Sequence, residues 1–234
     1  MAASSFAVRI GVSVPVVLNN LLHLDSLLGK IVTRAGGTIE DVPLTTTRGV
    51  AHGSAAILET GNYGAIQESW PRLKAIKRSD VPAGLTVGTK PAHRTIDAMS
   101  PYRNRLTYHT QYSSVRAIWF AGHGDAAAVA DLLADLSSVG GLWTVGHGET
   151  TKIEVFALDN VADAGLILAD GLVARAVPAD LWADLGHPIH PRAVTSNQRW
   201  KGPYWDGPKD TCVSPTQADL IGPRRDVMAM VGLH

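Results

Sequence analysis

The sequence contains little that would tie the protein to an oxidising or membrane environment. Its 234 residues include a single cysteine, Cys212, so no disulfide can form within the chain, which fits a reducing compartment. No run of 18 apolar residues is present, and we expect no membrane-spanning helix and no membrane partner. The N-terminal segment has one basic residue, Arg9, an apolar run broken by Pro15, and no small-residue cleavage site. We therefore expect no signal peptide and a cytoplasmic location.

An excess of charge of one sign is also lacking, because 21 basic and 21 acidic side chains balance. The distribution is uneven, however. From Trp70 to Arg116 nine Lys and Arg face two acids, a net charge of +7, and from Ala117 to His190 two bases face ten acids, a net charge of −8. Such a chain can offer one face to a polyanion and another to a basic partner, although ordinary solvated surfaces would give the same pattern.

Apolar residues make up 45% of the chain, enough to bury a sizeable core, and the length fits one domain over residues 1–234. Alternating apolar residues from Phe6 to Val14 predict a strand with one buried face, and leucines at helical spacing over 24–31 predict a helix. The later expected elements are strands near 53–60 and 115–120, a helix capped by Asp125 and ended by Gly140-Gly141, and a strand at 152–156. Two such strand–helix–strand units predict the α+β class and a ferredoxin-like domain.

Two segments interrupt this pattern. Residues 70–112 have weak periodicity, many bases and frequent Pro and Gly, which predicts a basic insertion built as a thumb-like hairpin or loops. After short strands within 166–177 and a helix at 178–185, residues 186–216 hold five prolines and three aromatic residues, which predicts an irregular arm.

The sharpest local motif is the glycine-rich loop at 140–149, expected between a helix and a strand. Glycines let backbone N–H groups approach phosphate oxygens, and successive N–H groups can form an anion-binding concavity, so the loop is a candidate anion site. The loop lacks the Lys and Ser/Thr of a P-loop, and a plain helix-ending turn with a bulge remains the alternative.

Basic and aromatic residues provide the other candidates for RNA binding, because guanidinium groups pair with phosphates and aromatic rings stack on unpaired bases. In the basic insertion these are Lys74, Lys77, Arg78, Arg94, Tyr102, Arg103, Arg105 and Tyr108, and in the arm they are Arg199 and Trp200. Solvated hairpin residues with core tyrosines are the alternative for the insertion, and packing within the protein's own core is the alternative for the arm.

No catalytic constellation stands out. The nine histidines show no His-Glu-x-x-His motif and no cysteine pair accompanies them, so we expect no metal site and no cofactor. His109 and His147 are the candidates if the protein uses a general base. We expect a protein that is not an enzyme.

An N-terminal strand, the sequence His23-Leu24-Asp25-Ser26-Leu27-Leu28, a basic excursion and a glycine-rich loop before a strand together resemble the RAMP superfamily of CRISPR-associated proteins. Within it the "HLDxLL" sequence is similar to the Cas-five-like subunit of type IV systems, the Csf-three family. The resemblance covers residues 6–35 and 113–156 well and the rest by length and order.

The resemblance implies an RNA-binding fold that caps the 5′ handle of a guide RNA without cutting it. It also implies that the loop residues Gly146, His147 and Gly148 bind RNA. It implies partners of three kinds: Cas-seven-like backbone subunits, a large Cas-eight-like subunit and, indirectly, target DNA. Two alternatives remain open at this point. One is a metal-independent guide-RNA endonuclease of the same superfamily, and the other is a small-molecule enzyme or a protein-interaction module.

Overall fold

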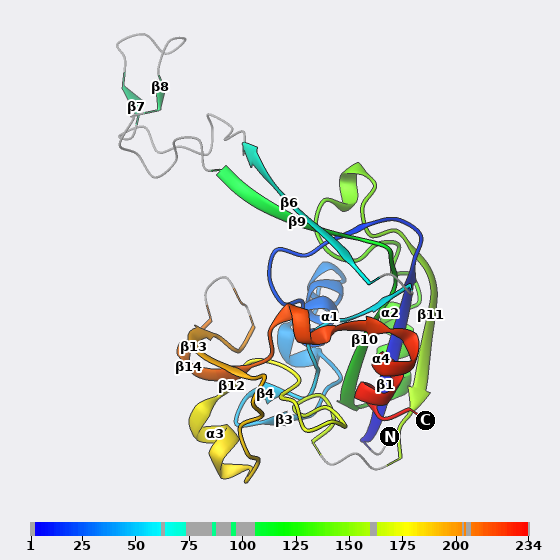
Figure 1. The fold of residues 1–234 in the computed structure, drawn as a ribbon, viewed down its shortest axis with the longest axis vertical. Helices are drawn as coiled ribbons and strands as arrows, with labels where there is room; N and C mark the ends of the chain where they lie inside the picture. The colour runs from blue at the N-terminus through cyan, green and yellow to red at the C-terminus, as the bar shows by residue number, and fades with distance from the viewer. Residues whose placement is uncertain are drawn as a thin grey trace.

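The computed structural model describes residues 3–61, 64–73, 86–87, 95–96, 106–159, 163–202, 204 and 207–233. A mixed sheet with helices on both faces forms its centre, so the prediction of a mixed helix-and-sheet protein is confirmed (Figure 1). The helices are α1 (Leu24–Arg34), α2 (Ala126–Leu133), α3 (Ala179–Asp184) and α4 (Arg224–Val231). No helix in these ranges is long and apolar enough to cross a bilayer.

The central sheet has five described strands in the order β11-β1-β10-β5-β15. Their bounds are β1 (Ser4–Val12), β5 (Ile57–Thr60), β10 (Val115–Gly124), β11 (Thr150–Ala157) and β15 (Ile221–Pro223). Neighbours run antiparallel except β15, which is parallel to β5. Helix α1 connects β1 to β5, and α2 connects β10 to β11, so each helix links two strands that have one other strand between them.

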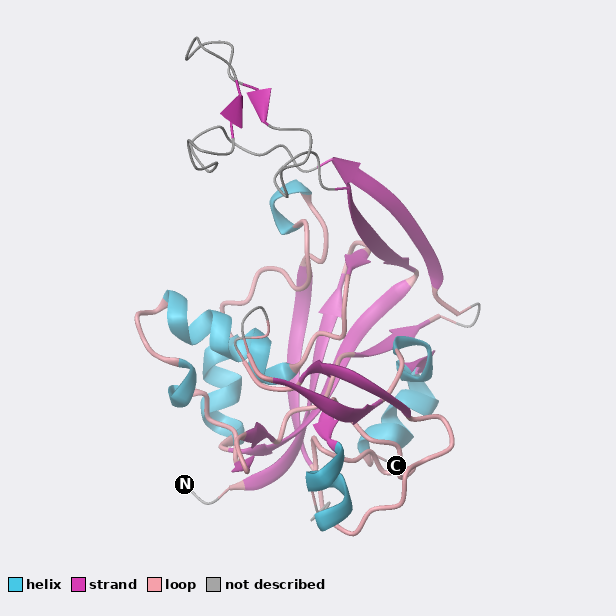
Figure 2. Ribbon diagram, turned by 90° about the vertical axis from the view of Figure 1, so that its left-hand side faces the viewer, coloured by secondary structure: helices cyan, strands magenta, loops and turns pink. Residues whose placement is uncertain are grey.

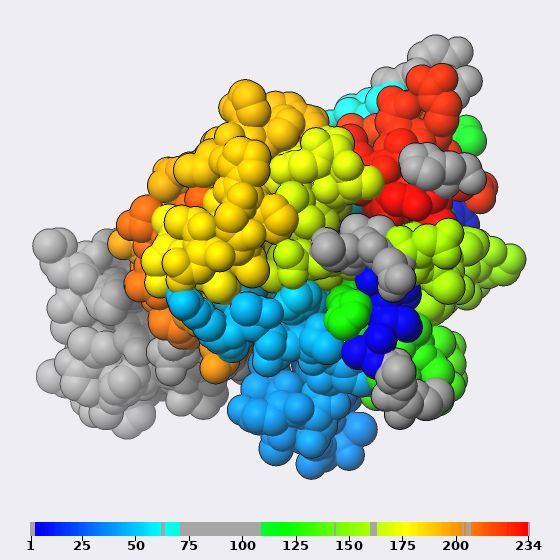
Figure 3. Space-filling view, turned by 90° about the horizontal axis from the view of Figure 1, so that it is seen from below, coloured from blue at the N-terminus to red at the C-terminus, as the bar shows by residue number. Residues whose placement is uncertain are grey.

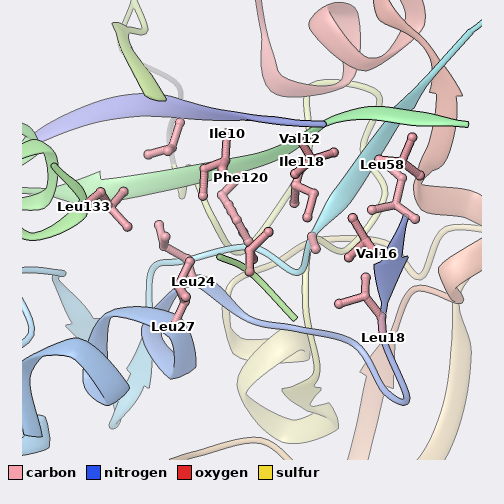
Figure 4. Packing of buried hydrophobic residues seen from close by; sticks show 14 of the residues in the cluster. Ile10, Val12, Val16, Leu18, Leu24, Leu27, Leu58, Ile118, Phe120 and Leu133 are labelled. Atoms are coloured by element: carbon pink, nitrogen blue, oxygen red, sulfur yellow. The ribbon is translucent and has the colours of Figure 1, made fainter. Parts of the chain in front are cut away.

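Both faces of this sheet are buried, and the prediction that β1 has only one buried face was wrong. Phe6, Val8 and Ile10 pack on one face with Leu24 and Leu28 of α1. Figure 4 shows Ile10 and Leu24 within this cluster. The other face lies under α4 and the segment that follows β11, where a second apolar cluster includes Ala7, Ile57, Trp119, Leu172 and Val227. A strand covered on both sides needs small or apolar residues at alternate positions, which the sequence supplies as alanine and glycine rather than as an obvious apolar run.

A polar pair also lies on that second face. Arg9 of β1 donates to both carboxylate oxygens of Glu59, at 3.0 and 3.1 Å, and to Glu154 at 3.2 Å, and Trp119 Nε1 donates to Glu59 at 2.7 Å. Burial of Glu59 opposes its ionisation, but the Arg9 and Trp119 hydrogen bonds outweigh this and hold its pKa below the usual value.

Two helix boundaries test the sequence interpretation. The Asp125 side chain accepts from Ala128 N at 3.1 Å, so the predicted cap of α2 is confirmed. The prediction that Gly140-Gly141 ends this helix was wrong, because α2 ends at Leu133. Gly141 instead donates its backbone N–H to Val17 O, so the glycines let the following loop return to the strand β2 (Val16–Val17).

A long hairpin, β6 (Ile66–Leu73) and β9 (Leu106–Ser113), lies between β5 and β10 in the chain. Figures 1 and 2 both show it extending beyond the central sheet. β2 pairs with β9, and Ser114, at φ +66°, joins β9 to β10. The hairpin overlaps both ends of the predicted insertion at 70–112; inside it, the described residues include a two-stranded pair, β7 (Thr86–Val87) and β8 (Thr95–Ile96).

The prediction of an irregular arm at 186–216 was wrong in part. β13 (Val194–Arg199) and β14 (Lys209–Ser214) pair along their whole length, and β12 (Val177–Pro178) adds a third strand. The five prolines of residues 186–216 lie outside β13 and β14. The sequence of β13 is polar and largely exposed, without the alternation that marks a half-buried strand. The helix predicted at 178–185 is α3, whereas of 166–177 only Val177 belongs to a named strand.

The remaining short elements are β3 (Thr46–Thr47), β4 (Val50–Ala51) and the 3-10 helices at Ile39–Asp41, Trp143–Val145 and Gln217–Leu220. Figure 3 shows the yellow surface around α3 directly beside the light-blue surface that includes β3 and β4. A third apolar cluster joins these parts, with Val50 packed among Leu166, Val173 and Trp182.

Candidate nucleic-acid interface

A groove of about 720 Å³ lies between α1, the loop before it, the glycines that follow α2, and the β13–β14 hairpin. Its apolar lining includes Leu27, Ile31 and Leu136, and polar groups come from Asn19 and Ser26 among others. Four cationic side chains line it: Lys30, Arg34, Arg199 and Lys209. This volume and mixture of walls are typical of ligand sites.

No carboxylate is found among the described residues that line the groove. In a chain with equal numbers of acids and bases, four cations that line one groove, with no acid among its described lining residues, concentrate positive potential in one place. Within the described ranges, no carboxylate lies within 4 Å of the charged ends of Lys30, Arg199 or Lys209. The groove therefore attracts anions.

Local structure explains two of these positions. The core stripe of α1 turns Leu24 and Leu28 inward and places Lys30 and Arg34, one helical turn apart, at its exposed edge. Partial burial lowers the pKa of Lys30, and the neighbouring Arg34 charge lowers it further. Two like charges at this spacing repel each other, and an anion between them would relieve the repulsion.

The opposite wall repeats this arrangement on a hairpin. Arg199 and Lys209 are directly paired across β13 and β14, and Arg199 Nε donates to Gly207 O at 3.1 Å. Like charges at directly opposite positions destabilise a strand pair. A phosphate bound between Arg199 and Lys209 would attract both charges and offset their mutual repulsion.

A buried ion pair fixes the hairpin wall to the helix wall. Arg175 is fully buried. Its Nη1 donates to Asp25 Oδ1 at 3.2 Å and to Gly53 O at 3.0 Å. Its Nη2 donates to Trp200 O at 3.0 Å and to Tyr204 Oη. Tyr204 Oη in turn donates to Asp25 Oδ2 at 2.8 Å. We call Asp25, Arg175 and Tyr204 the buried latch. Burial disfavours the charged guanidinium, but Asp25 and Tyr204 outweigh this and raise the pKa of Arg175.

The latch gives a structural reason for the His23-Leu24-Asp25 sequence. Leu24 is part of the core, and Asp25, in the first turn of α1, binds Arg175. His23 stacks on Tyr204 with ring centroids 4.9 Å apart. His23 lines the groove and is 5% exposed, and its buried Nε2 has no hydrogen-bond partner among the residues that the structure describes. Burial lowers the pKa of His23 to about 3, and the Arg175 charge lowers it further, so the ring is neutral near pH 7.

The neutral state of His23 predicts a loss of stability in acid. Below pH 6.5 the unfolded chain takes up a proton on this ring, whereas the folded protein does not until about pH 3, so stability falls as the pH falls through this window. Between pH 7 and pH 5 this group alone should cost about 2 kcal/mol. We expect His23→Phe to remove that part of the pH dependence of the free energy of unfolding, measured with urea. The variant should keep a smaller dependence of the same sign, because burial also lowers the pKa of His52. Equal slopes for the two proteins would contradict the assignment.

The glycine-rich loop is held mainly by its own backbone. Gly141 donates to Val17 O at 2.8 Å, Gly148 donates to Pro15 O at 3.0 Å, and both Val145 and His147 donate to Leu142 O. These four N–H groups already donate to backbone carbonyls and cannot also donate to a phosphate. Their arrangement favours the alternative of a helix-ending turn over a phosphate-binding loop. Gly140 and Gly141 line the groove, whereas Gly146, His147 and Gly148 do not.

Two glycines of this loop provide a matched stability test. Gly148 has φ +68° and a Cβ would lie 1.9 Å from Val139 O, whereas Gly146 has φ +88° with open space around it. Gly146→Ala should cost about 1–2 kcal/mol from the left-handed conformation alone. Gly148→Ala should cost about 1–3 kcal/mol more, because the backbone must move. Urea unfolding of both variants measures the difference, and equal losses would contradict the close approach.

The base of the β6–β9 hairpin adds an aromatic cluster beside the loop. The ring of Trp70 lies 6.3 Å from that of His109 and 6.5 Å from that of His147, measured between centroids. Asn19, which lines the groove, lies with its Nδ2 3.3 Å from His109 Nδ1 and accepts from Thr110 N. This cluster therefore continues the polar surface from the groove toward the hairpin.

The predicted RNA-binding residues have different positions. Arg199 lines the groove. Trp200 instead packs against the third apolar cluster and donates to Asp210 at 2.7 Å, which favours the alternative that this side chain packs within the protein's own core. Tyr108 pairs with Pro71 in the hairpin. Seven candidates lie outside the described residues: Lys74, Lys77, Arg78, Arg94, Tyr102, Arg103 and Arg105.

Sequence reasoning missed Lys30, Arg34 and Lys209. The only available signal was the spacing of Lys30 and Arg34 on one side of the predicted helix. A comparison with models of known protein families finds no match, and a search of curated proteins finds no related sequence. The functional argument therefore depends on the geometry of the site.

Proposed function

We propose that this protein binds single-stranded RNA in the groove between α1 and the β13–β14 hairpin and does not cut it. The observation that carries the proposal is the set of four cations and the apolar side chains that line the groove, with no carboxylate among its described lining residues. Cations pair with phosphates in any sequence, and apolar side chains suit the faces of unstacked bases. Duplex RNA hides its base faces, so it suits this groove less well.

The arrangement of the sheet supports a ferredoxin-like core for this protein. In chain order β1, α1, β5, β10, α2 and β11 give the pattern βαββαβ, and these four strands lie in the order β11-β1-β10-β5 with every neighbour antiparallel. The β6–β9 hairpin falls between the second and third of them, where the resemblance to RAMP proteins predicts a thumb-like insertion. We infer that the protein is a guide-RNA subunit of a type IV CRISPR complex, capping the 5′ handle beside backbone and large subunits.

The acidic segment gives weaker support to a basic partner. Of its ten acids, Glu154, Asp170 and Asp184 form ion pairs with side chains of this chain, and Asp163 Oδ2 lies 3.1 Å from His187 Nε2. Part of the negative charge is therefore used internally. Asp131 and Asp135 are exposed, at and just beyond the end of α2, and they are the best candidates for a contact with a partner subunit.

The direct test is binding of the intact protein to a fluorescent 20-nucleotide RNA of mixed sequence, measured by anisotropy. We expect tighter binding of the single strand than of the same strand in a duplex, with the RNA recovered at full length. Failure to bind, or equal binding of duplex and single strand, would overturn the proposal. Purification from cells that carry the genomic neighbours should also yield short RNAs that share one 5′ end.

One observation favours a metal-independent RNA endonuclease as the second candidate. His109 and His147 both lie beside Trp70, so two imidazoles, the side chain most often used for general acid–base catalysis, come close to one aromatic ring. Cleavage of a repeat RNA in excess EDTA, lost in His109→Ala or His147→Ala, would establish this activity. Intact RNA after prolonged incubation would leave the binding function.

A further inference from the structure

The cations of the groove cannot distinguish RNA from DNA, because both polymers carry the same phosphates. The group that separates the two is the ribose 2′-hydroxyl, which both donates and accepts hydrogen bonds. A groove that prefers RNA therefore needs a neutral polar side chain near its cations. The described lining residues with a side-chain hydroxyl or amide are Asn19, Asn20, Ser26, Ser138, Gln198 and Tyr204.

Three of these side chains already make hydrogen bonds within the protein. Asn19 uses both ends of its amide on the base of the β6–β9 hairpin. The Tyr204 hydroxyl belongs to the buried latch, and Gln198 donates its amide to Ser214 Oγ at 2.7 Å. Asn20, Ser26 and Ser138 remain, because their side chains have no hydrogen-bond partner among the residues that the structure describes.

Ser26 differs from the other two because it shares a helix with two of the cations. It precedes Lys30 by four residues and Arg34 by eight, so the three side chains lie at successive turns of α1, and all three line the groove. Side chains at this spacing have their Cβ atoms about 5–6 Å apart. The Ser26 oxygen is not buried, so a ligand in the groove can reach it.

We infer that the Ser26 hydroxyl binds a ribose 2′-hydroxyl of the strand in the groove, which makes the groove prefer RNA to DNA of the same sequence. A phosphate held by Lys30 brings the adjoining ribose toward the preceding turn of α1, where Ser26 lies. This inference rests on the proposed function and deepens it, because it assigns the choice between the two polymers to one side chain.

A purely local role in the helix is the competing explanation, because serine near the start of a helix often bonds to the backbone. Ser26 Oγ makes no such bond to a described residue. The two explanations separate in Ser26→Ala. Alanine is the better helix former, so the variant should fold, which urea unfolding checks. A local role would leave the ratio of RNA affinity to DNA affinity unchanged.

The experiment measures by anisotropy the affinity of the intact protein for one mixed single-stranded sequence, made as RNA, as DNA and as 2′-fluoro RNA. The fluorine keeps the sugar close to its ribose shape and removes the hydroxyl. We expect RNA to bind about threefold to tenfold more tightly than the other two, the range that one hydrogen bond gives. Ser26→Ala should lower the RNA affinity to that of DNA and leave the DNA affinity unchanged. Ser26→Thr keeps a hydroxyl and should retain the preference.

Two matched controls accompany these variants. Ser138→Ala removes the same group from the same groove but outside α1, and it should keep the preference for RNA. Lys209→Gln removes a cation from the opposite wall. It should weaken RNA and DNA equally and reduce the slope of log affinity against log salt by about 0.7.

The outcomes separate the inference from the proposed function. An unchanged preference in Ser26→Ala, or a loss as large in Ser138→Ala, would overturn the role of Ser26 and leave RNA binding intact. RNA and 2′-fluoro RNA that bind equally would also overturn it, because the groove would then recognise sugar shape. A wild-type protein that binds no single-stranded RNA would overturn both the inference and the proposed function.

Discussion

Replacing Arg175 by methionine is expected to destabilise the protein by about 3–5 kcal/mol, the cost of leaving one member of a buried ion pair alone. Asp25 would then keep its charge next to α1 with Tyr204 as its remaining side-chain partner, and the carbonyls of Ala51, Gly53 and Trp200 would lose their donor. A loss of this size is a large part of the total stability of an ordinary domain. Urea unfolding followed by circular dichroism at pH 7 measures it.

A surface ion pair provides the matched control. Arg192 donates to Asp170 at 2.5 Å, with the two side chains 41% and 33% exposed, so Arg192→Met should cost about 0–1 kcal/mol. The double variant Asp25→Leu with Arg175→Met should recover part of the loss, because no buried charge is then left unpaired. An Arg175→Met protein within about 1 kcal/mol of the wild type would show that the latch does not hold the two walls together.

Removing the four groove cations together is expected to weaken single-stranded RNA binding by about 100- to 1,000-fold at 0.1 M salt. Each phosphate contact to a single strand contributes about 0.7 to the salt slope, so the combined Lys30→Gln, Arg34→Gln, Arg199→Gln and Lys209→Gln variant should lose nearly 3 in slope. The fold should survive, because these side chains lie at the groove and the apolar core does not use them. Anisotropy titrations between 50 mM and 500 mM salt give both quantities.

The control for this experiment removes the same net charge from elsewhere. Arg48, Lys152, Arg192 and Arg225 are at least 41% exposed and do not line the groove. Replacing all four by glutamine should change affinity through long-range attraction only, an effect that salt screens. If both quadruple variants weaken binding equally, the RNA responds to overall charge and the groove is not its site.

The sequence was informative where local rules determine structure. Alternation in 6–14, the leucine stripe of α1 and the Asp125 cap each depend on neighbours a few residues away, and each predicted element is present. Arg175 shows the limit of such reasoning. It is one base in an acidic stretch, and nothing nearby in the chain marks it as buried, because its partner Asp25 is 150 residues away.

The same limit applies to the groove. Two of its cations are on α1 and two are on a hairpin near the other end of the chain, and no spacing rule relates the two sets. The basic segment at 70–116 is recognisable in the sequence because its charges lie close together along the chain. The cations of the groove are instead far apart in the sequence, and only folding brings them together.

The distance along the chain between the two walls of the groove has a consequence for synthesis in the cell. Ribosomes deliver the N-terminal half first, so the strands and helices up to β11 can pack while β13 and β14 are still missing. Arg175, Arg199, Tyr204 and Lys209 all emerge late, and the groove does not exist until they have folded back onto α1. A ribosome-bound chain that ends before Lys209 should therefore be unable to capture RNA in this groove, so loading with RNA has to wait until the β13–β14 hairpin has been made.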